Sequence, residues 1–185
     1  MIGAITAGFL GGAGAAVLGD YESLQTVTLA SAQSSVDFTS IPSTYTHLQL
    51  RVMNLNSATS AAATILVGTG GTVDSSNANY KSHRLTGDGA SATAGSFSGV
   101  PQNAWVTGNS NSSNPEILIL DILDYTNTNK YKTSRMLSGV DNNGSGEINL
   151  TSSVWLNTGA INVIRLTVNT GNFNQYSSFA LYGVK

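Results

Sequence analysis

Apolar and polar residues alternate along much of the chain after residue 20, and this period of two is typical of half-buried β-strands. Within residues 47–54, for example, Leu48, Leu50 and Val52 fall on one face of the expected strand. The pattern predicts eleven strands, over residues 21–30, 47–54, 63–67, 80–85, 104–107, 116–123, 133–140, 146–151, 153–156, 161–168 and 178–184.

Residues 116–123 are an exception to this alternation, because they are nearly all apolar. Such a run, bounded by Pro115 and Asp124, predicts a central strand that is buried on both faces. Long loops are expected where small polar residues gather, over residues 54–62, 68–79 and 87–95.

The turns between these strands are also visible in the sequence. The Asn143-Gly144 dipeptide lies between two apolar runs and predicts a hairpin turn over residues 141–146. No segment has a sustained helical period. The sequence therefore predicts an all-β fold, an antiparallel two-sheet sandwich of the jelly-roll type, formed by residues 20–185.

Residues 1–19 form a separate, Gly-rich segment without a charged side chain. No Lys or Arg occurs before Arg51, so the positive start of a secretory signal is missing, and the glycines weaken a membrane-spanning helix. We expect an extended arm that becomes ordered against a neighbouring subunit; a disordered tail and a removed or membrane-spanning segment are the alternatives. The residues expected to form its contacts are Ile2, Ile5, Gly8, Phe9, Leu10, Gly11, Gly12, Gly14, Val17 and Leu18.

Composition narrows the class of protein. Gly, Ser, Thr and Asn make up 82 of the 185 residues, yet the low charge and the many β-branched residues argue against disorder. Eight basic side chains against ten acidic ones provide no positive field for a phosphate backbone, so we expect no nucleic-acid partner. The chain has no cysteine and is long enough to fold without disulfides.

The candidate chemistry is sparse. A serine nucleophile needs an adjacent base, and the chain offers His47 and His83 without a nucleophile motif beside either. Asp121 and Asp124 are three positions apart, so on a strand they point to opposite faces and do not form a carboxylate pair. We expect no catalytic residue, no cofactor and no metal site, and hence no enzyme.

Aromatic residues are the remaining candidates for a binding role. Trp105, Trp155, Tyr125 and Tyr131 could line a subunit interface or stack against the rings of a glycan. For Trp155, which lies within an apolar strand, packing in the core or in a subunit interface is the favoured interpretation.

Several segments together resemble small virion structural proteins of tailed bacteriophages, a group that is common in aquatic phages. The resemblance runs from residue 1 to residue 185 and carries over no catalytic residue. The segments are MIGAIT at 1–6, YESL at 21–24, IPSTYTHLQLR at 41–51, NYKSHRL at 79–85, DILDYTNTNKYKT at 121–133 and YSSFALYGVK at 176–185.

This resemblance implies a location in the virion and a role in adhesion, and leaves two functions open. In the first, the chain is a capsid cement or decoration protein, a homotrimer on the outer surface of the shell whose arm contacts the major capsid protein. In the second, it is a tail-fibre or adaptor protein that docks to a tail component and binds a cell-surface glycan.

Overall fold

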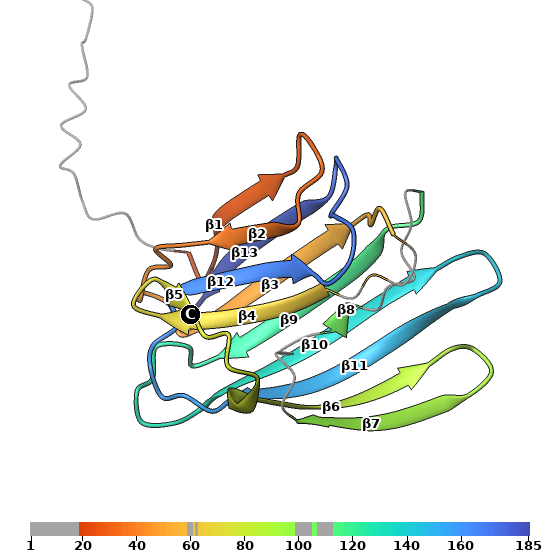
Figure 1. Cartoon of the computed structure of the whole chain (residues 1–185). Coiled ribbons are helices and arrows are strands. Elements are labelled where there is room, and N and C mark those ends of the chain that lie inside the picture. Colours follow the sequence, from red (N-terminus) through yellow and green to blue (C-terminus); the bar gives the residue numbers. More distant parts are fainter. Residues whose placement is uncertain (1–18, 59–60, 62, 99–104, 107–112) are drawn as a thin grey trace, which may run out of the picture.

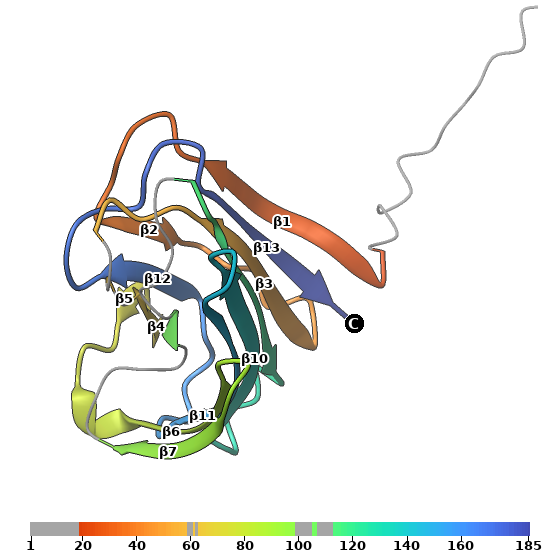
Figure 2. The same ribbon diagram turned by 90° about the vertical axis from the view of Figure 1, so that its right-hand side faces the viewer.

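The computed structural model describes residues 19–58, 61, 63–98, 105–106 and 113–185, with only the backbone described at 105–106. In these residues the fold is all-β, with two antiparallel sheets, as the sequence predicts. Figure 1 shows the smaller sheet lying over one face of the larger one. In Figure 2 the larger sheet bends, so that its far edge passes beneath the smaller sheet.

The larger sheet has eight strands, and β9 and β10 are its two middle strands. All of its neighbouring strands are antiparallel. In spatial order the strands are β1 (Tyr21–Thr28), β13 (Ser178–Val184), β3 (His47–Asn54), β9 (Glu116–Leu123), β10 (Lys132–Asp141), β11 (Gly146–Trp155), β6 (Tyr80–Gly87) and β7 (Ala92–Ser98).

The smaller sheet has five strands. Its spatial order is β2 (Ser35–Phe38), β12 (Val163–Val168), β4 (Ala63–Thr69) and β5 (Thr72–Val73), and the short β8 (Trp105–Val106) pairs with β4. One turn of 3₁₀-helix, η1 (Asn77–Asn79), leads into β6.

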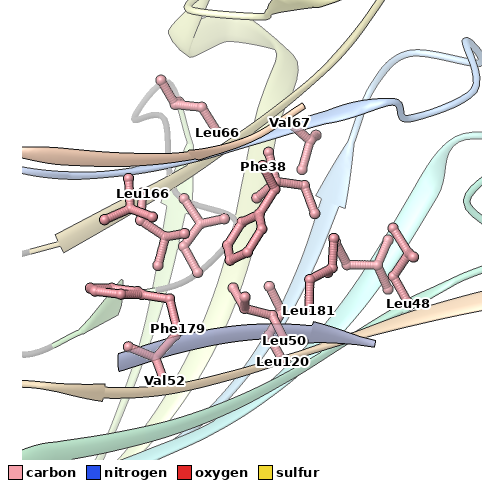
Figure 3. Packing of buried hydrophobic residues seen from close by; sticks show 14 of the residues in the cluster. Phe38, Leu48, Leu50, Val52, Leu66, Val67, Leu120, Leu166, Phe179 and Leu181 are labelled. Carbon is pink, nitrogen blue, oxygen red and sulfur yellow. The ribbon is translucent and has the colours of Figure 1, made fainter. Parts of the chain in front are cut away.

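The hydrophobic core lies between the two sheets. Phe38 from β2 and Leu166 from β12 pack toward Leu50, Phe179 and Leu120 of the larger sheet (Figure 3). The predicted apolar face of residues 47–54 is confirmed, because Leu48, Leu50 and Val52 are all buried. Burial of such side chains contributes about 1.5–3 kcal/mol each, so this layer is the main source of stability.

Most predicted strands are confirmed, three of them with the same bounds: β3, β9 and β13. The two strands predicted over residues 146–156 are one continuous strand, β11. Three strands were missed, namely β2, β5 and β7. The loop predicted over 87–95 is wrong for its second half, since β7 begins at Ala92; its Ala, Gly and Ser residues give no apolar alternation.

The prediction that residues 116–123 are buried on both faces is wrong. The strand is central, but its side chains alternate between buried and exposed positions. Leu118, Leu120 and Ile122 face the core, whereas Ile117 and Ile119 face outward. The smaller sheet covers the larger one on one side only, and within the described residues no element covers the other side of β9.

The predicted hairpin turn between β10 and β11 is confirmed. Asn143 and Gly144 both have positive φ, and the backbone N–H of Asn142 donates to the carbonyl of Ser145 over 2.7 Å. Gly146 closes the turn with φ of 152°, and a Cβ there would lie 2.3 Å from the carbonyl oxygen of Val140. This close approach explains why a glycine stands at the start of β11.

Candidate functional site

A band of large apolar side chains crosses the outer face of the larger sheet, the face turned away from the smaller sheet. Four of them follow one another on neighbouring strands, because Ile119, Leu137, Leu150 and Leu85 are successive Cα partners from β9 to β6. We call the whole set the outer apolar patch; its members are between 37% and 59% exposed. They are Met53, Leu85, Ile117, Ile119, Leu137, Ile148 and Leu150.

The patch exists because polarity is partly reversed in one half of the sheet. On β10, β11 and β6 six inward positions carry small polar side chains that are at most 4% exposed, beside core residues such as Met136 and Tyr80, while leucine and isoleucine face outward. An exposed sheet face normally carries the polar residues and the inward face the apolar ones. These inward residues are Ser82, Ser134, Ser138, Asn149, Thr151 and Ser153.

Three shallow depressions lie over the patch. One is lined by Arg51, Met53, Ile117 and Tyr182, from β3, β9 and β13. A second lies over β9, β10 and β11, lined by Ile117, Ile119, Leu137, Gly139 and Ile148. The third is lined by residues of β6, β7, β10 and β11, among them His83, Leu85, Arg135 and Leu150. Together they make the face uneven enough to receive side chains from another surface.

A row of polar side chains borders the patch on the same face. Gln49, Asp121 and Arg135 are successive Cα partners on β3, β9 and β10, and the row continues to Ser152 and His83. The Gln49 side-chain amide donates through Nε2 to Oδ1 of Asp121 over 2.8 Å. Polar and charged groups therefore meet the apolar band along one edge.

Two tyrosines and an arginine continue this border toward β1. The rings of Tyr21 and Tyr182 are stacked with centroids 4.8 Å apart, and Cζ of Arg51 lies 5.3 Å from both centroids. Gln49 Oε1 accepts hydrogen bonds from the Tyr21 hydroxyl (2.6 Å) and from Arg51 Nε (2.8 Å). Burial raises the pKa of Tyr21, and the Arg51 guanidinium opposes that shift.

The border also carries opposite charges side by side. Asp121 and Arg135 are Cα partners on the two middle strands. Within the described residues neither forms an ion pair; the ion pairs among charged side chains there are Lys130 with Asp124 and Arg165 with Asp37. An acid and a base are thus presented together to whatever lies against this face.

Two of the aromatic candidates from the sequence belong to the core. Trp155 is buried at the end of β11, and its Nε1 donates to Asp74 Oδ2 over 2.8 Å. Tyr125 is also buried, and its hydroxyl donates to the carbonyl of Pro42. Burial raises the pKa of Tyr125. Neither ring offers a surface to a ligand in this structure.

The other predicted contact residues are placed differently. Tyr131 is exposed immediately before β10, beyond the polar row that contains Arg135. The backbone of Trp105 pairs with Thr64 in β8, but its side chain lies outside the described residues. The whole set of predicted arm contacts, from Ile2 to Leu18, also lies outside them.

The histidines and nearby acids form no cluster that resembles a catalytic centre. Nδ1 of His47 accepts a hydrogen bond from the backbone N–H of Asp124 over 3.0 Å, and Lys130 pairs with the Asp124 carboxylate. These contacts lower the pKa of Asp124, with the Lys130 hydrogen bond as the largest cause. His83 lies apart from this group, in the polar row on β6.

No three His, Asp or Glu side chains converge in a group that could hold a metal ion, among the residues that the structure describes. In the same residues no helix has the length and apolar character to cross a membrane. Comparisons of the chain with protein-family models, with curated proteins and with solved structures give no match.

The sequence contains a signal for the outer apolar patch that the prediction of a doubly buried strand concealed. Residues 116–123 have apolar side chains at both odd and even positions, that is, on both faces of the strand. This pattern fits a strand that is buried on both faces, and it fits equally well a strand whose outer face is exposed until a partner covers it. Leu137 and Leu150 directly adjoin the inward-facing Met136 and Thr151 in the sequence, so both leucines face outward. Register across the strands, which the sequence does not contain, brings these side chains together.

Proposed function

We propose that the chain is a structural protein of a tailed-phage virion, a capsid cement or decoration protein that binds the outside of the shell as an oligomer. The observation that carries this proposal is the outer apolar patch, which spans neighbouring strands of one sheet. An exposed apolar surface of this extent is characteristic of a site that another molecule covers. The resemblance of the sequence to small virion proteins is the reason to propose a phage virion as the assembly.

The low charge of the chain supports the same role. Charged residues account for 10% of the sequence, with a net charge of −2. A surface with so few charges gives little electrostatic repulsion between closely packed neighbours. Hydroxyl and amide groups instead supply the polar surface, which suits a protein that is packed against other subunits.

The strand pairing favours a jelly roll as the finer class of this sandwich. Strands from the beginning of the chain pair with strands from its end, and each further pair lies inside the previous one along the sequence. The pairs are β1 with β13, β2 with β12, β6 with β11, and β9 with β10. Such nesting is what results when a long hairpin is rolled into two sheets. Jelly rolls are frequent in viral capsid proteins and in lectins, so this class is compatible both with a capsid cement protein and with a protein that binds a glycan.

The Gly-rich arm, residues 1–19, is the proposed attachment to the shell. Its apolar residues, such as Ile5, Phe9 and Leu10, would be buried against the major capsid protein, and its glycines would let the two backbones approach closely. In the full-length chain, replacing these three residues by serine should abolish binding to capsids while leaving the β-sandwich folded. Unchanged occupancy on capsids would show that the arm is not the attachment.

The test of the proposed function is the copy number of the chain in purified virions, measured on a quantitative gel against the major capsid protein. A cement protein occupies repeated sites on the shell, so we expect on the order of hundreds of copies per particle. Between a few and some tens of copies would indicate the tail instead. Absence of the chain from virions would refute both locations.

The second candidate function is a tail-fibre or adaptor protein that binds a glycan. Tyr21, Tyr182 and Arg51, together with Gln49 and Asp121, favour it, because glycan sites combine aromatic rings with amide and carboxylate groups. It predicts binding of the purified protein to host cells or their polysaccharide, reduced by Tyr21→Ala and unaffected by the control Tyr176→Ala. An absence of binding in both assays would leave the cement function.

A further inference from the structure

We propose that a second copy of the chain covers the outer apolar patch, in a face-to-face contact around a two-fold axis that runs along the strands between β9 and β10. This inference rests on the proposed function for the existence of an oligomer. It goes further by naming the surface and its symmetry, a two-fold contact in place of the homotrimer expected from the sequence. We choose a second copy as the occupant because residues on one half of the outer face complement the residues of the same row on the other half.

The proposed axis passes through the middle of the eight-stranded sheet. Four strands, β1, β13, β3 and β9, lie on one side of it, and β10, β11, β6 and β7 lie on the other. A two-fold rotation about this axis places β9 of one copy over β10 of the other, and β3 over β11. Cα partners on β9 and β10 therefore face each other across the contact.

The apolar rows are complementary under this rotation. Ile119 of one copy faces Leu137 of the other, since the two are Cα partners within a chain. In the next row Ile117 faces Gly139, so that a large side chain meets a position without one. Two strands apart, Met53 faces Ile148 through their shared row with Ile117 and Gly139. In the row of Ile119 and Leu137, Arg51 faces Leu150, with its guanidinium turned toward the rings of Tyr21 and Tyr182. The apolar part of the contact thus consists of two pairs of large side chains and one pair of a large side chain with glycine.

The polar row is complementary as well. Asp121 of one copy faces Arg135 of the other, and the rotation repeats this pairing, which gives two ion pairs across the contact. In the same row Gln49 faces Ser152, two groups that can form a hydrogen bond. A contact with apolar rows in its middle and polar groups at its edge has the usual anatomy of a protein interface.

The available area fits a weak dimer. The larger sheet bends toward the smaller one, so its outer face is convex and curves away from the axis on both sides (Figure 2). Neighbouring strands lie about 4.8 Å apart and same-face residues about 6.8 Å apart, so three rows over the four strands nearest the axis, from β3 to β11, cover about 400 Å² per copy. Two copies together would bury about 800 Å², which is the size of a transient interface. The low charge of the chain does not oppose this contact.

Sedimentation velocity of the full-length protein tests the contact. We expect the wild-type chain to sediment at twice its 19.1 kDa mass at about 100 micromolar and as a monomer when diluted. Changing Leu137 and Leu150 together to threonine keeps strand-forming residues but removes apolar contact, and should weaken the dimer about 100-fold or more. The matched controls are Tyr131→Thr and Tyr176→Thr, which remove exposed large side chains elsewhere and should leave the dimer unchanged.

Exchanging the charges of Asp121 and Arg135 gives a second test of the contact, which does not depend on whether the leucine variant folds. Arg135→Asp should weaken the dimer about tenfold or more, because it places acidic groups against each other, and adding Asp121→Arg should restore the wild-type dissociation constant. Circular dichroism and thermal unfolding of each variant confirm that the sandwich is intact.

The outcomes separate this inference from the proposed function. A wild-type protein that is monomeric or trimeric at about 100 micromolar, or a dimer that survives the leucine and charge changes, would overturn the two-fold contact. Copy number in virions is unaffected by that result and tests the function by itself. Folded leucine variants that keep the dimer but no longer bind capsids would assign the patch to the capsid protein.

Discussion

At the residue scale, the least expected group is the buried ammonium of Lys132. Its side chain is only 2% exposed at the start of β10, and Nζ donates to the carbonyls of Asn127 (2.5 Å), Lys130 (3.0 Å) and Thr158 (2.9 Å). These three bonds tie the turn after β9 to the segment before β12. Burial lowers the pKa of Lys132, with the nearby charge of Lys130 adding to the shift.

The Lys132→Met variant should be less stable than the wild type by about 1–3 kcal/mol, because three partly buried carbonyl groups would lose their charged donor. The control is Lys81→Met, since Lys81 donates to Ser98 at the exposed edge of the sheet; that change should alter stability by less than about 0.5 kcal/mol. Urea unfolding followed by fluorescence measures both. Equal midpoints for the two variants would disprove the structural role of Lys132.

The pairing of Asp37 with Arg165 makes the stability of the fold depend on pH. Arg165 donates from Nε (2.7 Å) and Nη2 (2.6 Å) to the two oxygens of Asp37, and these hydrogen bonds lower the pKa of that carboxyl. A carboxyl with a lowered folded-state pKa binds fewer protons in the folded state. Its contribution to stability is therefore complete above the unfolded-state value of 3.8 and is lost as the pH falls through the lowered pKa.

We expect Asp37→Asn to destabilise the protein by about 0.5–1 kcal/mol at neutral pH, a small effect because both side chains are partly exposed. The difference from the wild type should begin to shrink as the pH falls below 3.8, where Asp37 of the unfolded chain becomes protonated, and should be lost below the lowered pKa of the folded state. Thermal unfolding of both proteins across this range measures the effect. A difference that stays constant with pH would show that the ion pair does not stabilise the fold.

At the scale of the elements, β9 is the informative strand, because its two faces have similar side chains in different surroundings. Leu118 faces the core and is buried, whereas Ile117 next to it is exposed in the outer apolar patch. Leu118→Ala should destabilise the chain by about 2–5 kcal/mol, and Ile117→Ala by less than about 1 kcal/mol. Unfolding at submicromolar protein concentration keeps the contribution of association small.

If Ile117→Ala destabilised the dilute protein as much as Leu118→Ala does, both faces of β9 would be buried within one chain. That result would restore the original prediction from the sequence and remove the outer apolar patch as a candidate surface.

How far the sequence predicted the elements depended on how strongly each one alternates. Strands β3 and β13 alternate clearly and were predicted with their observed bounds, as was the hairpin turn with its Asn143-Gly144 dipeptide. Strand β7 was missed because an edge strand of Ala, Thr, Gly and Ser shows no apolar period. The burial of β9 was mispredicted because which sheet faces which strand is a tertiary property.

The candidate site was less predictable than the fold. Exposed leucines on β10, β11 and β6 look like core residues in the sequence, and the buried serines between them look like surface residues. Cross-strand register is required to see that Leu137, Leu150 and Leu85 form one row. The aromatic candidates Trp155 and Tyr125 illustrate the reverse case, since both fill the core.

At the scale of the whole molecule, the two sheets are unequal, and this inequality leaves the outer apolar patch uncovered within the described residues. Five strands cover one face of an eight-stranded sheet, and the opposite face carries apolar rows next to a polar border. A protein of this kind reaches its most stable state in an assembly, where those rows are removed from water. Adhesion between subunits, with the arm as a second contact, is the function that we propose.

The central claim is that the outer apolar patch is buried when the protein is assembled, and cysteine labelling tests it most directly. The chain has no cysteine, so Leu150→Cys and the control Tyr131→Cys each introduce a single reactive thiol. In the assembled protein we predict that maleimide labels the Leu150→Cys variant at least about tenfold more slowly than the Tyr131→Cys variant, and that dilution to the monomer removes this difference. Equal labelling rates in the assembled protein would contradict the claim.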